Sequence, residues 1–197
     1  MVNRSALRMG IILFLILTPC LIYFGAGGFG SPLCAEGDLD SDGIREEYIL
    51  DRQTLTVREG AELLWQSPKD WSVDNFDLGD ADNDGTVNLV ITLWKTGNFG
   101  TVRPFWETGA DASYKNHLFV FKMQNNTFKP VWCSSDLDRP IVSFAIRDVN
   151  GDGLEELVVE EGEYRKMIGE RYALNPHGQI RTTFWQWEEW GFRMVRE

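Results

Sequence analysis

The sequence contains few of the residue types on which catalysis and covalent cross-linking depend. It has only 2 histidines, His117 and His177, and it has no nucleophile elbow, zinc-type histidine cluster, Cys–His pairing or phosphate-binding loop. Of its 3 cysteines, Cys20 and Cys34 fall in the N-terminal leader, so a processed chain would keep only Cys133 and could form no internal disulfide. Catalysis is left with one possibility, in which the two histidines meet across two long loops as a base and its partner.

Basic residues are also scarce. The full sequence carries 19 Lys and Arg against 30 Asp and Glu, a net charge of −11. Removal of the leader with its two arginines leaves 17 basic residues and a net charge of −13. This excess of negative charge argues against nucleic acid as a partner.

Acidic residues are absent from the leader, residues 1–35, which is uncharged after two arginines near its start. This layout is typical of a secretory signal peptide, and we expect cleavage after Ala35. An uncleaved anchor is the alternative, because the uncharged run is long enough to span a bilayer, and lipidation of Cys20 or Cys34 is a third possibility. In each case the rest of the chain is extracytoplasmic, either secreted or anchored, and touches the membrane only through this segment.

What the sequence does contain is one acidic loop pattern that occurs three times, at residues 38–46, 80–88 and 148–156. Positions 1, 3 and 5 carry side-chain oxygens, position 6 is Gly, and position 9 is Glu, Asn or Glu. Gly at position 6 lets the loop curl so that its carboxylates converge, and converging carboxylates need a cation. Calcium fits best, because it accepts about six to eight oxygens in loose geometry, including a backbone carbonyl from position 7. The expected ligands, for up to three ions, are Asp38, Asp40, Asp42, Ile44 and Glu46; Asp80, Asp82, Asp84, Thr86 and Asn88; and Asp148, Asn150, Asp152, Leu154 and Glu156. Asn88 lacks a carboxylate, so we expect the second loop to bind most weakly.

An apolar run typical of a β-strand follows each loop, and a two-stranded hairpin follows each run. Alternating strands also precede the second and third loops. We therefore expect an all-β domain over residues 36–197, with units of four antiparallel strands at about 38–66, 72–133 and 140–196. The first unit is expected to lack its inner strand, because Cys34 and Glu36 stand where Phe and an aliphatic residue are required. Such units bury their apolar faces by radial stacking, as the blades of a β-propeller do.

These units resemble FG-GAP or VCBS repeats, the calcium-binding propeller blades known from integrin α-subunit heads and from many bacterial exported proteins. The resemblance covers nearly all of residues 38–197 and is specific in the loops, which match D-x-[DN]-x-D-G-x-x-[DE] except at Asn88. It implies a role in adhesion or recognition in which calcium is structural.

Three units are fewer than the four to eight blades of a closed propeller. The stack should therefore be a partial or small propeller, open at its end and exposing an apolar face. We expect a second copy of the chain, another protein, or the insertion at residues 95–116 to cover that end. A homodimer through the open end would give six blades.

Long connections at residues 95–116 and 163–181 should emerge opposite the calcium loops. They are rich in aromatic and basic residues, which suit the binding of a protein or glycan partner. The alternative is that they fold back over the open end. The candidate partner-binding residues are Lys95, Phe99, Arg103, Trp106, Tyr164, Arg165, Arg171 and Tyr172.

The function expected from these features is a calcium-binding recognition or assembly module at the cell surface, without catalytic activity. A carbohydrate-binding module is one alternative, with Trp185, Trp187 and Trp190 as a possible sugar-stacking platform. A small extracytoplasmic hydrolase that uses the two histidines is the other.

Overall fold

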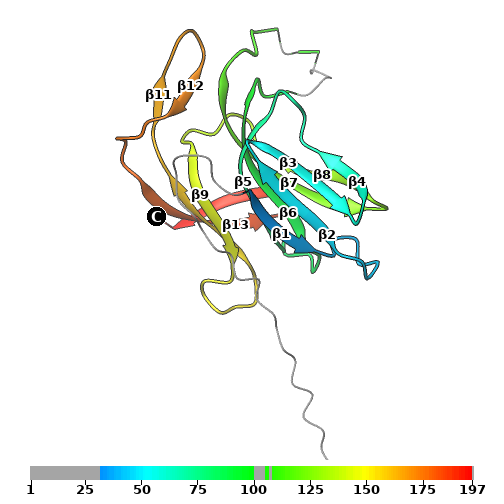
Figure 1. The fold of residues 1–197 in the computed structure, drawn as a ribbon. Coiled ribbons are helices and arrows are strands. Elements are labelled where there is room, and N and C mark those ends of the chain that lie inside the picture. The colour runs from blue at the N-terminus through cyan, green and yellow to red at the C-terminus, as the bar shows by residue number, and fades with distance from the viewer. Residues whose placement is uncertain (1–31, 100–104, 107, 197) are drawn as a thin grey trace, which may run out of the picture. The chain divides into compact units, whose positions relative to one another are not determined.

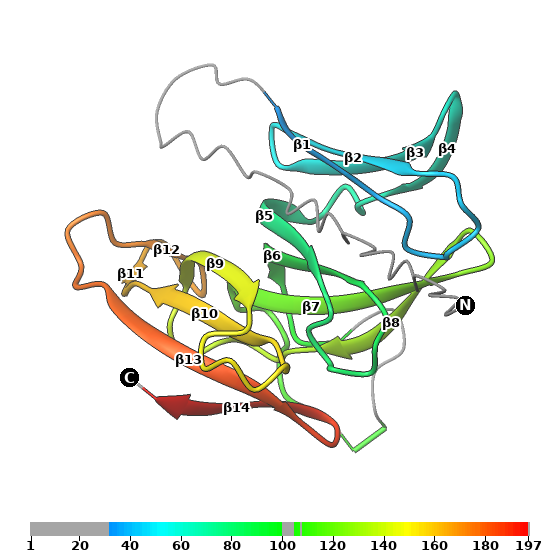
Figure 2. The same cartoon turned by 90° about the horizontal axis from the view of Figure 1, so that it is seen from below.

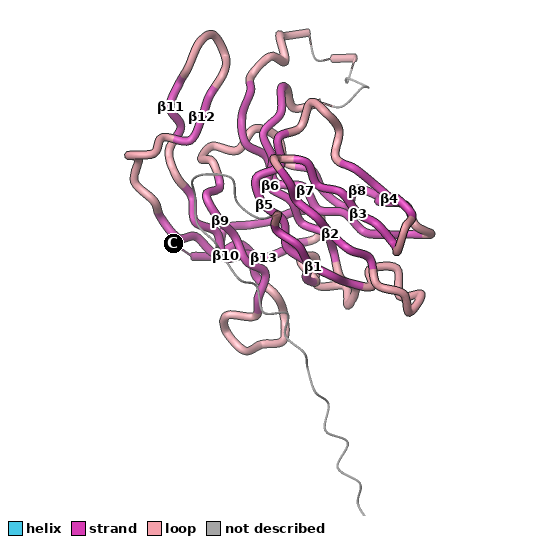
Figure 3. The backbone as a smooth tube through the Cα atoms, in the orientation of Figure 1, coloured by secondary structure: helices cyan, strands magenta, loops and turns pink. Residues whose placement is uncertain are grey.

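The computed structural model describes residues 32–99, 105–106 and 108–196, and these ranges contain fourteen β-strands and no helix (Figures 1 and 3). The expected all-β class is therefore confirmed. The expected leader, apart from its last residues, and Arg103 lie outside the described ranges. Within these ranges no helix is present that is long and apolar enough to cross a membrane.

The first sheet, sheet A, consists of β1 (Leu33–Gly37), β2 (Glu46–Asp51), β3 (Thr54–Glu59) and β4 (Glu62–Gln66), antiparallel and in chain order. The presence of β1 corrects the expectation that this unit has no inner strand. All five of its residues pair with β2, from Leu33 opposite Leu50 to Gly37 opposite Glu46.

The reason for this error is the direction in which the side chains of β1 point. Leu33 and Ala35 pack against the core, whereas Cys34 and Glu36 are exposed on the outer face of sheet A. That face carries further exposed charges, such as Glu47 on β2 and Arg58 on β3. Apolar residues are needed only where another sheet covers a strand, so polar residues in these places are compatible with β1. The outer face of sheet A is consequently polar, which corrects the expectation of an apolar face at this end. Cleavage after Ala35 would remove Leu33 to Ala35 from β1.

Sheet B consists of β5 (Ser72–Gly79), β6 (Asn88–Thr96), β7 (Tyr114–Gln124) and β8 (Thr127–Cys133), also in chain order. Every residue of β6 except its last is buried. Its side chains alternate between two cores, which explains why this strand is apolar throughout rather than at every second residue.

Sheet C consists of β9 (Ile141–Arg147), β10 (Glu156–Glu161), β13 (Arg181–Glu188) and β14 (Gly191–Arg196). A small hairpin, sheet D, interrupts the connection from β10 to β13 and contains β11 (Tyr164–Lys166) and β12 (Tyr172–Leu174). The strands that we expected around the second and third loops, and the hairpins that follow all three loops, are present.

Sheets A, B and C follow one another in space as they do in sequence, with sheet B between the other two (Figure 2). Tyr48 and Leu55 of sheet A share one core with Ile91 of sheet B. Val90 of sheet B shares a second core with Leu157 of sheet C. Because neighbouring residues of β6 point into different cores, one strand holds both interfaces together.

Candidate metal loops

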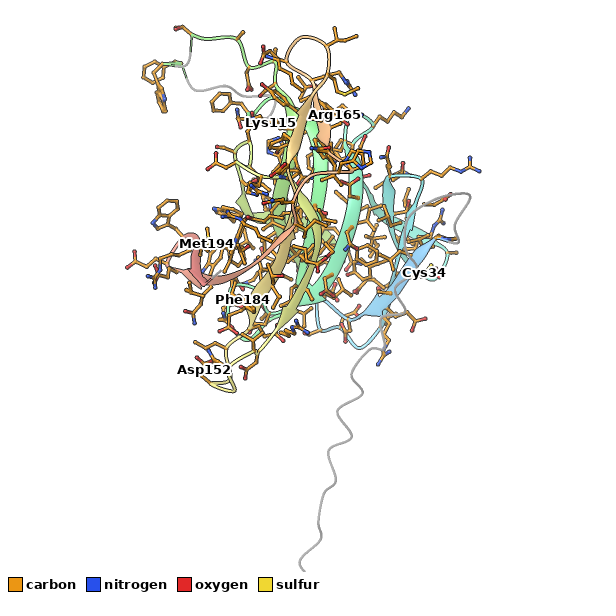
Figure 4. The ribbon with its side chains drawn as sticks, turned by 90° about the vertical axis from the view of Figure 1, so that its left-hand side faces the viewer. Cys34, Lys115, Asp152, Arg165, Phe184 and Met194 are labelled. Carbon is orange, nitrogen blue, oxygen red and sulfur yellow. The ribbon has the colours of Figure 1, made fainter. Side chains whose placement is uncertain are left out.

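The three acidic loops connect the first strand of each large sheet to the second, β1 to β2, β5 to β6 and β9 to β10. We call them loop 1 (residues 38–46), loop 2 (80–88) and loop 3 (148–156). Asp152 of loop 3 lies at the end of the molecule opposite Lys115 and Arg165 (Figure 4). The glycine at position 6 of each loop, Gly43, Gly85 or Gly153, has a φ of 91°, 88° or 86°. This left-handed conformation directs its amide back toward the aspartate at position 1.

Loop 1 gathers three carboxylates. Asp38 Oδ2 accepts a hydrogen bond from the Gly43 amide at 3.1 Å, and Asp42 Oδ1 accepts one from the Ile44 amide at 2.7 Å. Oxygens of Asp38, Asp40 and Asp42 all lie within 4.8 Å of one another. The backbone therefore fixes the carboxylates close together, although their charges repel.

Glu46, at position 9 of loop 1, is fully buried. Its Oε2 accepts hydrogen bonds from the Leu39 amide at 2.9 Å and the Tyr48 hydroxyl at 3.2 Å. Its Oε1 has no hydrogen-bond partner in the part of the chain that the structure describes. Burial raises the pKa of Glu46, and the nearby charge of Asp40 adds to this effect. A buried carboxylate with an unpaired oxygen beside three converging carboxylates fits an oxygen-liganded divalent cation.

Loop 2 has the same backbone geometry. Asp80 Oδ2 accepts a hydrogen bond from the Gly85 amide at 2.7 Å, and Asp84 Oδ1 accepts one from the Thr86 amide at 3.0 Å. Asn88 is fully buried at position 9, and its Oδ1 accepts a hydrogen bond from the Asp82 amide at 3.2 Å.

Loop 2 differs from loop 1 because a lysine from β7 reaches it. Lys122 Nζ lies 2.8 Å from Asp82 Oδ2 and also donates a hydrogen bond to Asp84. The bond to Lys122 lowers the pKa of Asp84. Partial burial acts against the charged ammonium, but the two aspartates outweigh it and raise the pKa of Lys122. Sequence analysis missed this residue, because only the strand register brings Lys122 to the loop.

In loop 3 the side-chain amide of Asn150 links two other side chains of the loop. Asp148 Oδ2 accepts a hydrogen bond from the Gly153 amide at 2.9 Å, and backbone amides lower the pKa of Asp148. Asn150 Nδ2 donates to Asp152 Oδ2 at 3.0 Å and to Glu156 Oε1 at 3.1 Å. Asn150 therefore joins the side chains at positions 5 and 9. The carboxylates of loop 3 do not form a group as close as the three aspartates of loop 1 or those of loop 2, Asp80, Asp82 and Asp84, whose oxygens lie within 4.8 Å of one another.

A set of hydrogen bonds joins loop 2 to loop 3. Glu155 Oε2 accepts a hydrogen bond from the Asp80 amide at 2.6 Å. The side chain of Asn83 accepts one from the Glu155 amide at 2.6 Å and donates another to the Glu155 carbonyl at 3.0 Å. We call this set the Asn83–Glu155 link. It couples the geometry of loop 2 to that of loop 3 across the interface of sheets B and C.

The expected partner surface is only partly exposed. Lys95 is just 5% exposed and donates a hydrogen bond to the Gly97 carbonyl, so it is not a surface residue. Phe99 is half-buried, and its amide donates to Asp111 Oδ2 at 3.1 Å. Trp106 is 66% exposed, and Arg165 is also exposed.

The other expected surface residues belong to an intramolecular cluster. Tyr164 stacks edge-on against Trp94, with a ring separation of 5.9 Å, and against Tyr172 at 5.6 Å. The guanidinium of Arg171 lies 4.0 Å from the centre of the Tyr114 ring. The hairpin of sheet D thus packs onto the end of sheet B. Sheet B is the middle sheet, so this contact does not cover an open end of the stack, and the alternative that the insertions cover that end stays a prediction.

The two histidines are placed differently from each other. His117 is fully buried in β7, with Nδ1 at 3.2 Å from the Ser134 carbonyl and Nε2 at 3.4 Å from Asp136 Oδ1. Burial lowers the pKa of His117. His177 is exposed. Because His117 does not reach solvent, its geometry does not support the hydrolase alternative.

A pocket of about 520 Å³ lies at the last hairpin, where Trp132 and the residues of the β13–β14 turn form its lining. Trp190 in this turn is 79% exposed. Trp187 contacts Phe192, which in turn packs against Trp132. These three aromatic rings form one cluster, and Trp132 and Phe192 are part of the lining of the pocket.

A scan of the sequence against protein-family models, a search of curated proteins and a search of solved structures each found no match.

Proposed function

We propose that this chain is an exported, calcium-stabilised recognition or assembly module whose three large sheets are blades of a partial β-propeller of the FG-GAP or VCBS type. Calcium has a structural role and fixes the turns between first and second strands. The opposite end of the molecule, where Trp106 and Arg165 are exposed, meets a protein or glycan partner at the cell surface.

The observation that carries the calcium proposal is the carboxylate of Glu46. It is fully buried at the end of loop 1, the charge of Asp40 acts on it, and its Oε1 lacks a hydrogen-bond partner among the described residues. An unpaired buried carboxylate costs free energy unless it is protonated or binds a cation. A calcium ion would satisfy that oxygen and remove the repulsion between the aspartates.

Thermal unfolding of the full chain, with chelator and with millimolar calcium, tests this proposal. A ligand at about 100 times its Kd stabilises by about 2.7 kcal/mol, which corresponds to an increase in Tm of roughly 5–10 °C for a domain of this size. Glu46→Gln should lose part of that increase, yet it should be as stable as wild type in chelator because it removes a buried charge. The neighbouring exposed residue offers the control, and Glu47→Gln should behave as wild type. Equal Tm values with chelator and with calcium would contradict the proposal.

Carbohydrate binding is a second candidate, because the pocket beside the exposed Trp190 offers an indole face next to Glu188, Glu189 and Arg193. Glycan-array binding that Trp190→Ala abolishes, and that Trp106→Ala leaves intact, would favour this site. Loss of binding in Trp106→Ala alone would instead place the ligand at the opposite end.

We propose that homodimerisation does not use the outer face of sheet A. The outer face of sheet A carries Glu36, Glu47 and Arg58, all exposed, so it needs no apolar cover. We propose that any self-association uses sheet C. Light scattering of wild type and of Arg58→Glu, which changes the polar face of sheet A, should give the same mass.

A further inference from the structure

In each of the sheets A, B and C, one residue of the third strand is the cross-strand neighbour of the residue at position 9 of that sheet's acidic loop. In sheet C, Glu156 is paired with Gln186. In sheet B, Leu89 is paired with Phe121, and one further step along the strands places Asn88 opposite Lys122. In sheet A, Glu47 is paired with Arg58, and one further step places Glu46 opposite Glu59. Glu59, Lys122 and Gln186 therefore occupy the same place, which we call the third-strand position.

In loop 2 this position supplies a cation from the chain itself. The ammonium of Lys122 binds Asp82 and Asp84. The side-chain exposures are 17% for Lys122, 8% for Asp82 and 50% for Asp84, so the pair with Asp82 is largely shielded from water and the pair with Asp84 is not. A divalent ion in this loop would have to displace the ammonium or lie beside it, and both alternatives are unfavourable.

In loop 1 the same position has the opposite charge. Glu59 Oε2 is buried and lacks a hydrogen-bond partner within the described ranges. The carboxylates of Asp42 and Asp40 are among the charges that act on Glu59. Loop 1 thus has two carboxyl groups with an unpaired oxygen, those of Glu46 and Glu59, and the charge of Asp40 acts on both. Loop 2 has one such oxygen, Asp82 Oδ1, but there the ammonium of Lys122 binds the other oxygen of the same carboxylate. Loop 3 is intermediate, because Gln186 adds no charge.

We propose that the third-strand position sets how strongly each loop binds a divalent cation: Glu59 makes loop 1 the tightest site, Gln186 leaves loop 3 weaker, and Lys122 replaces the cation in loop 2. This inference rests on the proposed calcium binding and refines it, because the chain then binds two ions and not three. It also gives Lys122 a structural role. Loop 2, which the Asn83–Glu155 link joins to loop 3, keeps its geometry without calcium because the lysine offsets part of the repulsion between Asp82 and Asp84.

Calorimetric titration of the chelator-treated full chain with calcium tests the proposal. Wild type should bind two ions. Lys122→Gln should bind a third and should lose thermal stability in chelator but regain it in calcium, whereas Lys122→Arg should remain a two-site protein. Glu59→Gln should weaken the tightest site by about tenfold or more, the effect expected when a charged ligand is lost.

The chain offers matched controls for both substitutions. Lys129 is the cross-strand neighbour of Lys122, and Glu62 is that of Glu59, and both are exposed. Lys129→Gln makes the same charge change as Lys122→Gln away from loop 2 and should leave the stoichiometry unchanged. The charge of Glu62 acts on Glu59, so Glu62→Gln should change the tightest Kd, but by much less than Glu59→Gln does.

Three results would overturn the proposal, and they separate it from the proposed function. Three ions bound to wild type, with no change in Lys122→Gln, would overturn it while calcium binding stood. Equal effects of Glu59→Gln and Glu62→Gln on the tightest site would do the same. No heat of binding in wild type or in any variant would overturn both proposals.

Discussion

The Asn83–Glu155 link offers a direct measurement of how strongly sheets B and C are joined at their loops. Asn83 makes two hydrogen bonds to the backbone of Glu155, at 2.6 Å and 3.0 Å, and has a φ of 54°. Asn83→Ala removes both bonds and places Ala in a left-handed conformation that Asn tolerates better. Two hydrogen bonds at about 1 kcal/mol each, with the conformational cost added, predict a loss of about 2–4 kcal/mol in the free energy of unfolding.

Ser41 provides the control, because it stands at the same position of loop 1 with a φ of 60° and is exposed. Ser41→Ala should change the free energy of unfolding by less than about 0.5 kcal/mol. Urea unfolding followed by tryptophan fluorescence should therefore show a midpoint about 1 M lower for Asn83→Ala than for Ser41→Ala, given an m-value of about 2–3 kcal/mol/M. Equal midpoints for the two variants would refute the argument that the link carries stability between the sheets.

Two further predictions concern Gly79, which is half-buried, and His117, which is buried. A Cβ at Gly79 would lie 2.7 Å from Ile146 Cγ2 and 2.9 Å from Glu155 Oε2, so Gly79→Ala should lower the free energy of unfolding by about 1–3 kcal/mol. Gly109→Ala, whose Cβ meets nothing within 4 Å, should cost much less, and equal losses in urea would contradict this prediction. Burial lowers the pKa of His117. The hydrogen bond to the Ser134 carbonyl opposes this shift, as do Asp136 and Asp111, whereas the charge of Lys95 adds to it. The unfolded chain therefore takes up this proton first as pH falls. The free energy of unfolding of wild type should therefore fall relative to that of His117→Asn below the unfolded pKa of about 6.5. The fall should be at most about 1.4 kcal/mol per pH unit. Parallel profiles of the free energy of unfolding against pH for the two proteins would show the reasoning to be wrong.

Continuous apolar runs were sufficient to predict strands such as β6, which is buried on both faces, and alternating apolar residues to predict strands such as β5. Apolar alternation failed at β1, because Cys34 and Glu36 lie on the outer face of sheet A, where both are exposed and do not pack against another described sheet. The same reason makes that side polar, so an apolar end could not be inferred there from the repeat alone. A pattern of apolar and polar residues indicates which faces of a strand are packed. A sheet at the end of a stack packs on one face only, so its other face can be polar.

The loop pattern likewise predicted which side chains converge but not all that surrounds them. Glu59 and Lys122 are outside the nine-residue pattern, and the register of the third strand alone brings them to loops 1 and 2. Whether the aromatic residues of the insertions are packed or exposed was harder still to predict. Composition cannot distinguish Tyr164, which packs on Trp94, from Trp106, which is exposed.

A crystal structure of the full chain grown in calcium, with anomalous difference density collected at a long wavelength, tests the central claim most directly. The account predicts calcium peaks within about 2.3–2.6 Å of carboxylate oxygens in loop 1, including Glu46, and in loop 3. It also predicts that Lys122 Nζ stays against Asp82 with no peak in loop 2. A peak in loop 2 with Lys122 displaced would contradict the ordering of the sites, and the absence of a peak in all three loops would contradict calcium binding itself.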